Sequence, residues 1–92
     1  MVKKLEELDA GTAVLCGEQQ VGEVRGVYTI GESRLAEYLN VFWNARDGEV
    51  LVPTSEVLEI ENRGVILQGP MESYNDLNDF LPAAYPAIKR LR

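Results

Sequence analysis

Short hydrophobic runs, each followed by a turn-forming residue, succeed one another along most of the chain. They are rich in the β-branched and aromatic residues that favour strands, and each is followed by Gly, Asn or Pro. The runs are residues 12–16, 21–30, 35–43, 49–52, 57–61 and 65–68. The last three of them all begin within residues 48–67, a spacing that suits one side of a small, highly curved sheet. The pattern predicts a mainly β fold, namely a small SH3-like β-barrel of about six short strands.

The first residues have a helical pattern instead. Val2, Leu5 and Leu8 are spaced three apart with charged residues between them, and we expect the helical segment to end at Asp9. One amphipathic turn or two, packed over a barrel opening, would bury these three side chains together.

The pattern also changes after residue 70. Ser73 and Asp76 fit a capping box, which predicts a short helix over residues 74–81, and residues 87–91 could form a further helical turn. We therefore expect two parts, a small β-barrel over residues 1–70 and a helical tail over residues 71–92. The tail is too apolar to remain unpacked, so it docks on the barrel or on a partner chain.

Two strand candidates carry special features. In residues 21–30, Gly22 and Gly26 share a face with Val24, Tyr28 and Ile30, which indicates a strand that bends sharply.

In residues 35–43 both faces are apolar. Leu39, Val41 and Trp43 alternate with Tyr38 and Phe42. A barrel has only one interior, so the outer face must be covered by the chain's own ends, by another chain or by a partner.

Charge makes nucleic acid an improbable partner. The net charge is −6, and five of the nine basic residues lie at the two ends, which leaves four basic against fifteen acidic residues in the body. Such a surface repels phosphate backbones, so we expect no direct binding of DNA or RNA.

There is no apolar run of the roughly 18–20 residues that a membrane span needs, and the start lacks the apolar core of a signal peptide. We expect a cytoplasmic protein.

Residue types also exclude several chemistries. The chain has no histidine, which removes Ser-His-Asp and Cys-His catalysis and histidine-ligated metals. Cys16 is the only cysteine, so no disulfide can form within the chain. At the end of an apolar run, a buried inert thiol is the expected state.

Carboxylates offer the remaining candidate chemistry. Glu59 and Glu61 share one face of a strand, where a solvated pair is the expected role and acid–base catalysis the alternative. Asp76, Asn78 and Asp79 offer oxygen ligands but lack the spacing of a calcium loop. No phosphate-binding glycine motif is present. We expect no enzyme activity, and we predict no catalytic, cofactor-binding or metal-binding residue.

The order of these signals resembles a PRC-barrel domain, the small β-barrel found in the H subunit of the photosynthetic reaction centre and at the C-terminus of a bacterial ribosome-maturation factor. The matching positions are Gly11 with 13–15, 21–24 with Val27 and Tyr28, then 39–41, 51–53, 57–60 and 65–67. These are structural positions, so the resemblance implies a fold and carries no activity or site residue.

The function that these observations favour is a non-catalytic protein-interaction or assembly module that associates with itself, as a homo-oligomer, or with a protein partner. Its predicted surface consists of the aromatic residues outside the expected core, namely Tyr38, Phe42, Trp43, Tyr74, Phe80 and Tyr85. A regulatory domain that binds a small molecule or an ion is the alternative. A role in ribosome or RNA metabolism is a further alternative, which the PRC-barrel resemblance alone suggests.

Overall fold

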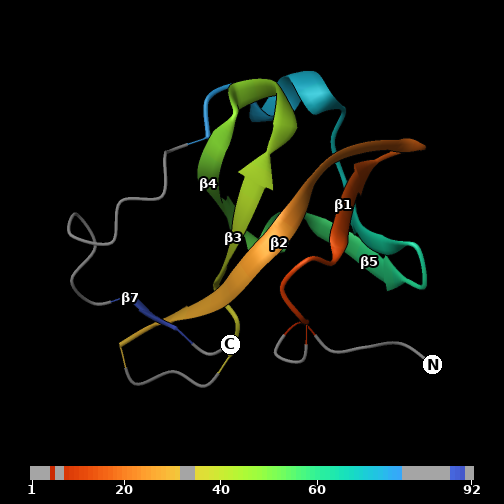
Figure 1. Cartoon of the computed structure of the whole chain (residues 1–92). Helices are drawn as coiled ribbons and strands as arrows, with labels where there is room; N and C mark the ends of the chain where they lie inside the picture. The colour runs from red at the N-terminus through yellow and green to blue at the C-terminus, as the bar shows by residue number, and fades with distance from the viewer. Residues whose placement is uncertain (1–4, 6–7, 32–34, 78–87, 91–92) are drawn as a thin grey trace.

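A computed structural model describes residues 5, 8–31, 35–77 and 88–90. Seven strands account for most of these residues (Figure 1). They are β1 (Ala13–Cys16), β2 (Gln19–Ile30), β3 (Tyr38–Trp43), β4 (Gly48–Pro53), β5 (Val57–Glu61), β6 (Gly64–Leu67) and β7 (Ile88–Arg90). Three short 3₁₀ helices connect them: η2 (Asn44–Arg46), η3 (Thr54–Glu56) and η4 (Met71–Tyr74). The mainly β fold predicted from the sequence is confirmed.

The strands form one mixed sheet around the long strand β2. The order is β4-β3-β2-β1-β6-β5, with β7 added to β2 beside this path. All pairs are antiparallel except β1 with β6, which is parallel. In Figure 1, β3 and β4 lie on one side of β2, and β1 and β5 lie on the other. The described pairing runs from β4 at one edge to β5 at the other, and it includes no ladder between these two strands.

A bulge in β2 decides which of its residues face the core. The register with β3 shifts between Val24 and Gly26, so Arg25 is an extra residue. Val24 and Val27 are both fully buried, whereas Tyr28 is half-buried and Ile30 is exposed. The sharp bend expected of this strand is therefore present, but the placement of Tyr28 and Ile30 on the face of Val24 was wrong. One extra residue reverses the alternation of side chains beyond the bulge.

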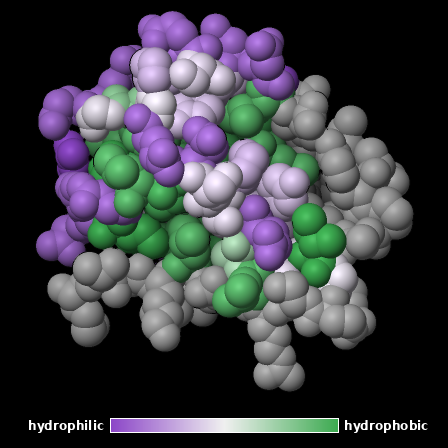
Figure 2. Space-filling model, turned by 180° about the vertical axis from the view of Figure 1, so that it is seen from behind, coloured by the Kyte–Doolittle hydropathy of each residue, from purple (hydrophilic) through white to green (hydrophobic). Residues whose placement is uncertain are grey.

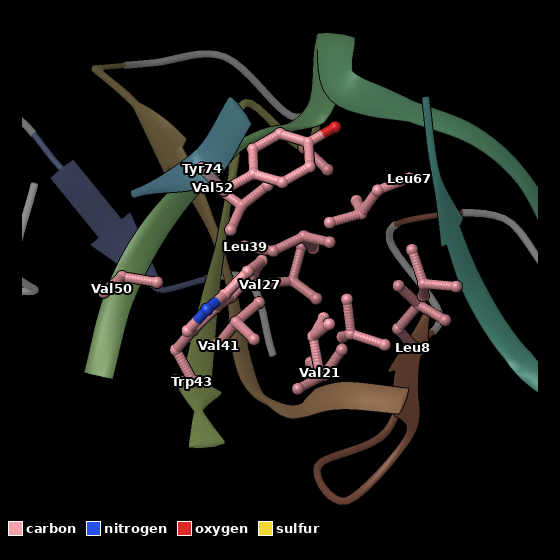
Figure 3. Close-up of a cluster of buried hydrophobic side chains, with 14 residues drawn as sticks. Leu8, Val21, Val27, Leu39, Val41, Trp43, Val50, Val52, Leu67 and Tyr74 are labelled. Carbon is pink, nitrogen blue, oxygen red and sulfur yellow. The ribbon is translucent and has the colours of Figure 1, made fainter. Parts of the chain in front are cut away.

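The core lies on the inner face of this bent sheet (Figure 3). It consists mainly of valines from the strands, together with Leu8, Leu39, Trp43, Leu67 and Tyr74. Val14, Val24, Val27, Leu39, Val41, Val50, Val52 and Val65 have no exposed surface. Burying apolar surface at about 25 cal/mol per Å² is the main source of stability in a domain of this size.

Short turns join consecutive strands. The 3₁₀ helix η3 follows Pro53 and ends at Glu56, and Arg63 lies in the tight turn between β5 and β6. At the Asp47–Gly48 turn the left-handed residue is Asp47, with φ of 49°, and not the glycine. Aspartate tolerates this conformation better than most residues. Strand β3 begins at Tyr38, three residues later than expected.

The helices predicted from the sequence are not present among the described residues. The described residues contain no α-helix. Most of the turn expected over residues 2–9 lies outside the described residues, although Leu8 is buried at 1% exposure. Ser73 lies inside η4 and does not cap a helix, and residues 78–81 of the expected helix are outside the described residues. The helical turn expected over residues 87–91 was wrong, because Ile88–Arg90 is strand β7. An edge of β2 offers this segment backbone partners that a short helical turn lacks.

No helix in the described part of the chain is long and apolar enough to cross a membrane.

Candidate functional site

The outer face of β2, β3 and β4 is the surface that the sequence left unassigned. Its residues alternate with those of the core, and the strand register arranges them in three rows. The rows are Glu23–Phe42–Glu49, Gly26–Asn40–Leu51 and Tyr28–Tyr38–Pro53. Three of these nine residues are aromatic and two are acidic, so this outer face differs from the polar surface that usually covers a solvated sheet.

Phe42 is the centre of the first row. Its ring lies beneath the guanidinium of Arg25, with 5.2 Å between Cζ and the ring centroid. Arg25 also forms an ion pair with Glu23, at 3.2 Å between Nη2 and Oε1. Arg25 reaches this position because the bulge in β2 places it over β3. The ring face therefore already holds a cation, which is a favourable arrangement for an aromatic quadrupole.

The second row contains a buried polar residue. Asn40 is 4% exposed, and its Nδ2 donates a hydrogen bond to Oε1 of Glu49 at 2.7 Å. Its Oδ1 is buried and has no hydrogen-bond partner among the described residues. Leu51, the neighbour of Asn40 on β4, is also buried, at 5% exposure, although both face outward. This part of the outer face is therefore closed to solvent.

The third row leads to an exposed apolar end. Tyr28 and Tyr38 are directly opposite each other and half-buried. Ile30, two residues further along β2, is 44% exposed, and Leu35, in the connection to β3, is 67% exposed. The backbone N–H of Glu37 still bonds to the carbonyl of Tyr28 at 2.9 Å, so this connection continues the hairpin. We call Tyr28, Ile30, Leu35 and Tyr38 the hairpin patch.

Strand β7 adjoins the hairpin patch. Its residues Ile88, Lys89 and Arg90 are opposite Ile30, Thr29 and Tyr28 in an antiparallel register. Nη2 of Arg90 donates a hydrogen bond to the carbonyl of Arg25 at 3.1 Å. Strand β1 pairs with the first half of β2, up to Glu23, so β7 occupies the same edge of β2 further along.

Of the six residues predicted to form an interaction surface, the four that the structure describes fall into two separate pairs. Tyr38 and Phe42 lie on the outer face of β3, half-buried. Trp43 and Tyr74 are 1% and 2% exposed and pack against each other in the core (Figure 3), so their assignment to a surface is corrected. Large aromatic rings supply more buried area than any other side chain, and a small core uses them. Phe80 and Tyr85 lie outside the described residues.

Sequence reasoning missed Tyr28, Ile30 and Leu35 as surface candidates. The alternation across 21–30 places Tyr28 and Ile30 inside, and only a bulge near Gly26 reverses it. A glycine within a strand is the available signal for such a bulge, although it does not say which residue is the extra one.

The paired carboxylates Glu59 and Glu61 lie at an exposed edge. A hydrogen bond between them, together with the charge of Glu61, raises the pKa of Glu59. The pKa of Glu61 is lowered by the same hydrogen bond and by that from Arg63, whose Nε is 2.9 Å from Oε1 of Glu61. Arg63 also contacts Glu18 at 3.0 Å. These are solvated ion pairs, whose net contribution to stability is small.

A shallow hollow lies beside Cys16. Its volume is about 480 Å³, and the lining comes from the ends of β1 and β6, from β5 and from the start of η4, including Leu58, Pro70, Met71 and Glu72. Burial, and next the charge of Glu72, raises the pKa of the Cys16 thiol, which favours its protonated form. Figure 2 shows hydrophobic residues reaching the surface on the side where β5 lies.

Comparisons of this chain with protein-family models, with curated proteins and with solved structures find no match.

Proposed function

We propose that this protein is a non-catalytic interaction module that associates with a second copy of itself through the hairpin patch. The observation that carries the proposal is the exposure of Ile30 and Leu35 at one end of the β2–β3 hairpin, next to two half-buried tyrosines. Of the three large hydrophobic side chains exposed in the described chain, two belong to this patch. Aromatic and aliphatic residues grouped at a surface, with charges at the margin, are typical of interfaces between proteins.

The charge distribution supports a protein partner over a nucleic acid. The first row of the outer face places Glu23 and Glu49 on either side of Phe42. Carboxylates in this position repel a phosphate backbone, but they accept hydrogen bonds from a protein. A second copy brings basic groups of its own, since β7 carries Lys89 and Arg90.

Light scattering over a dilution series of the full-length chain tests the proposal. We expect the mass of a dimer, or of a larger closed assembly, with dissociation only on strong dilution. Leu35→Glu places a charge in the hairpin patch and is expected to shift the equilibrium towards the monomer. Leu58→Glu is the matched control, because Leu58 is equally exposed, at 62%, but lies on β5.

A monomer at every concentration would reject the proposed self-association. Equal weakening by Leu35→Glu and Leu58→Glu would reject the hairpin patch as the contact surface.

We also propose that this domain is a PRC-type barrel. The support for this proposal is that strands β1 to β6 lie at the positions where the resemblance predicts strands. Closure of the sheet into a barrel would bring the edges at β4 and β5 together through η3, the short connection between them.

The hollow beside Cys16 supports a second candidate function, the binding of a small apolar molecule. Its volume of about 480 Å³ is within the range of small-molecule sites, and Leu58 and Met71 offer apolar contacts. A ligand that binds only the folded state raises the unfolding temperature. A screen of small metabolites against the wild type and Leu58→Glu tests this candidate. A temperature rise in the wild type that Leu58→Glu abolishes would support it, and a flat response would reject it.

A further inference from the structure

The sheet ends in two edge strands, β4 and β5, and β5 is the more accessible of the two. Among the described residues, β4 pairs with β3 alone and β5 pairs with β6 alone. Three of the six residues of β4 are buried and only Glu49 is exposed, whereas three of the five residues of β5 are exposed and none is buried. An edge strand presents backbone N–H and C=O groups that another chain can pair with. An extended segment can therefore add to this sheet at β5.

Leu58 offers an apolar contact at one end of the β5 edge. The register of β5 with β6 shifts between Val57 and Glu59, so Leu58 is the extra residue of a bulge. Its side chain is 62% exposed and lines the hollow beside Cys16, together with Met71. Figure 2 shows hydrophobic residues at the surface on this side of the molecule. A strand that adds to β5 can place an aliphatic side chain in this hollow, since pockets for alternate side chains give strand addition its specificity.

The remainder of the β5 edge is acidic. Glu59 and Glu61 are both exposed, and they lie close enough to share a hydrogen bond. Arg63 is 2.9 Å from Glu61 and 3.0 Å from Glu18, so one guanidinium serves three carboxylates. Two neighbouring carboxylates favour a cation beside them, and opposite charges on facing strands stabilise the strand pair. Charge complementarity therefore indicates a basic partner.

The same charges disfavour a second copy of this chain as the occupant of the edge. Two β5 strands side by side would bring Glu59 and Glu61 of one copy against the same residues of the other. Like charges directly opposite each other destabilise a strand pair. Charged residues and a bulge are also the devices that protect edge strands from pairing with their own kind. They exclude an acidic strand but attract a basic one, which is a specificity set by repulsion as well as by attraction.

We infer that the edge of β5 binds an extended basic segment of a partner protein by strand addition. The segment carries Lys or Arg at alternate positions facing Glu59 and Glu61, and an aliphatic residue that enters the hollow beside Leu58. In Figure 1, β5 lies on the opposite side of β2 from β3, which carries Tyr38 of the hairpin patch. The inference therefore does not depend on the proposed self-association.

Fluorescence anisotropy with a labelled synthetic peptide tests this inference on the full-length protein. The probe has Lys and Thr in alternation, followed by Leu-Val. We expect saturable binding of this probe and none of a control peptide with Glu in place of Lys. A probe with Ser in place of Leu-Val should bind more weakly, because it leaves the hollow beside Leu58 empty.

Variants of the protein locate the contact. Glu59→Lys should weaken binding of the probe about tenfold, since it turns a cross-strand attraction into a repulsion. Glu37→Lys changes the net charge equally at an exposed residue in the connection between β2 and β3, and it should leave binding close to that of the wild type. Glu59→Gln, with a smaller expected loss, replaces Glu59→Lys if that variant does not fold, and Glu37→Gln is then its control.

Backbone methylation distinguishes strand addition from general attraction between charges. One probe is N-methylated at every Lys, and another is N-methylated at every Thr. Residues of a strand direct their N–H groups alternately towards and away from the neighbouring strand, so only one of the two methylated probes should lose binding.

Loss of binding by one methylated probe, together with weakening by Glu59→Lys but not by Glu37→Lys, would support strand addition at β5. Equal binding of the two methylated probes would overturn it. Equal weakening by Glu59→Lys and Glu37→Lys would also overturn it, because the probe would then respond to net charge alone. No binding of the Lys probe to the wild type would do the same.

Discussion

Tyr74 stands edge-on against Trp43, with 5.7 Å between the ring centroids and an angle of 61° between the ring planes. Trp43 is the last residue of β3, and Tyr74 is the last residue of η4. Their contact therefore links η4, which follows β6 in the chain, to strand β3 of the sheet. Both residues are almost completely buried, and edge-to-face pairs add about 0.5–1.5 kcal/mol beyond the burial of area. The start of the tail is therefore part of the core.

The hydroxyl of Tyr74 provides the first prediction. It accepts a hydrogen bond from the backbone N–H of Gly69 at 2.8 Å and donates one to Glu56 at 3.1 Å. Tyr74→Phe keeps the ring but leaves the Gly69 N–H without its partner, so we expect a loss of about 1–2 kcal/mol in the free energy of unfolding. Urea unfolding followed by tryptophan fluorescence measures it.

Tyr38→Phe is the matched control for this change, since the structure gives the Tyr38 hydroxyl no hydrogen bond among the described residues. We expect a change below about 0.5 kcal/mol. Equal losses in the two variants would contradict the role assigned to the Tyr74 hydroxyl.

Alkaline pH should destabilise the protein through two neighbouring groups. Burial raises the pKa of the Tyr74 hydroxyl, and burial also raises the pKa of the Cys16 thiol. The unfolded state therefore releases these protons first, at a pH of about 8.5 for cysteine and about 10 for tyrosine. The stability that they contribute is complete below those values and is lost as the pH rises through the folded-state pKa of each group.

Unfolding curves recorded from about pH 8 to about pH 11 check this dependence. Other titratable residues contribute equally to the pH dependence of all variants. The quantity compared is therefore the slope of the free energy of unfolding against pH. The double variant Cys16→Ala, Tyr74→Phe is expected to lose less stability across this range than the wild type. Parallel curves would show that neither group is the cause.

Close packing at Gly22 provides a third prediction. A Cβ added there would lie 2.0 Å from the carbonyl oxygen of Phe42 and 3.2 Å from Cγ1 of Val41. Since a backbone oxygen cannot move aside without breaking the β2–β3 ladder, Gly22→Ala is expected to cost at least about 2 kcal/mol. Gly48→Ala is the control, because its nearest neighbour would be 3.7 Å away and its φ is not left-handed. A thermal unfolding midpoint close to the wild type is expected for Gly48→Ala, and the same midpoint for both variants would refute the packing argument.

Asn40 offers a contrast between two substitutions of similar size. Asn40→Leu removes a buried oxygen that has no partner, at the cost of the hydrogen bond to Glu49, so we expect stability within about 1 kcal/mol of the wild type, or higher. Asn40→Asp instead places a buried carboxyl beside Glu49 and should cost about 2 kcal/mol or more at neutral pH.

The pH dependence identifies the cause of the Asn40→Asp loss. Burial and the charge of Glu49 would raise the pKa of the new carboxyl in the folded state. Its penalty should therefore be largest at neutral pH and disappear as the pH falls to about 3.9, where the unfolded state also binds the proton. Chemical unfolding at three pH values measures this, and a penalty that does not change with pH would exclude charge as the cause.

The strands could be predicted from the sequence because each combines a hydrophobic run with a turn residue that ends it. Pro53, for example, ends β4 because it lacks the N–H that a ladder requires. The bulge at Arg25 could not be located in the same way, since it depends on the pairing with β3. Strand β7 was also missed, because three residues are too few to show an alternation and their conformation is decided by the distant edge of β2.

The candidate surface was less predictable than the fold. Alternation alone indicated that Tyr38 and Phe42 share one face of their strand, but which face is the outer one follows only from the structure. Trp43 is predicted at the same surface because aromatic residues suit both a core and an interface, and its burial against Tyr74 in the structure assigns it to the core. The importance of Ile30 and Leu35 depends on their exposure, which the sequence does not contain.

The parallel pairing of β1 with β6 has a consequence for the order of folding. Val14 pairs with Val65 and Cys16 pairs with Leu67, so the first strand in the sequence pairs with β6, which comes after β2, β3, β4 and β5 in the chain. The hairpins β2–β3 and β3–β4 join neighbouring strands and can form early, whereas the β1–β6 ladder must first close a long loop. During synthesis, β1 would therefore keep an unpaired edge until β6 has left the ribosome. Mutations that weaken this ladder should slow the last step of folding more than the first, and they should lengthen the period in which the nascent chain is open to wrong pairing.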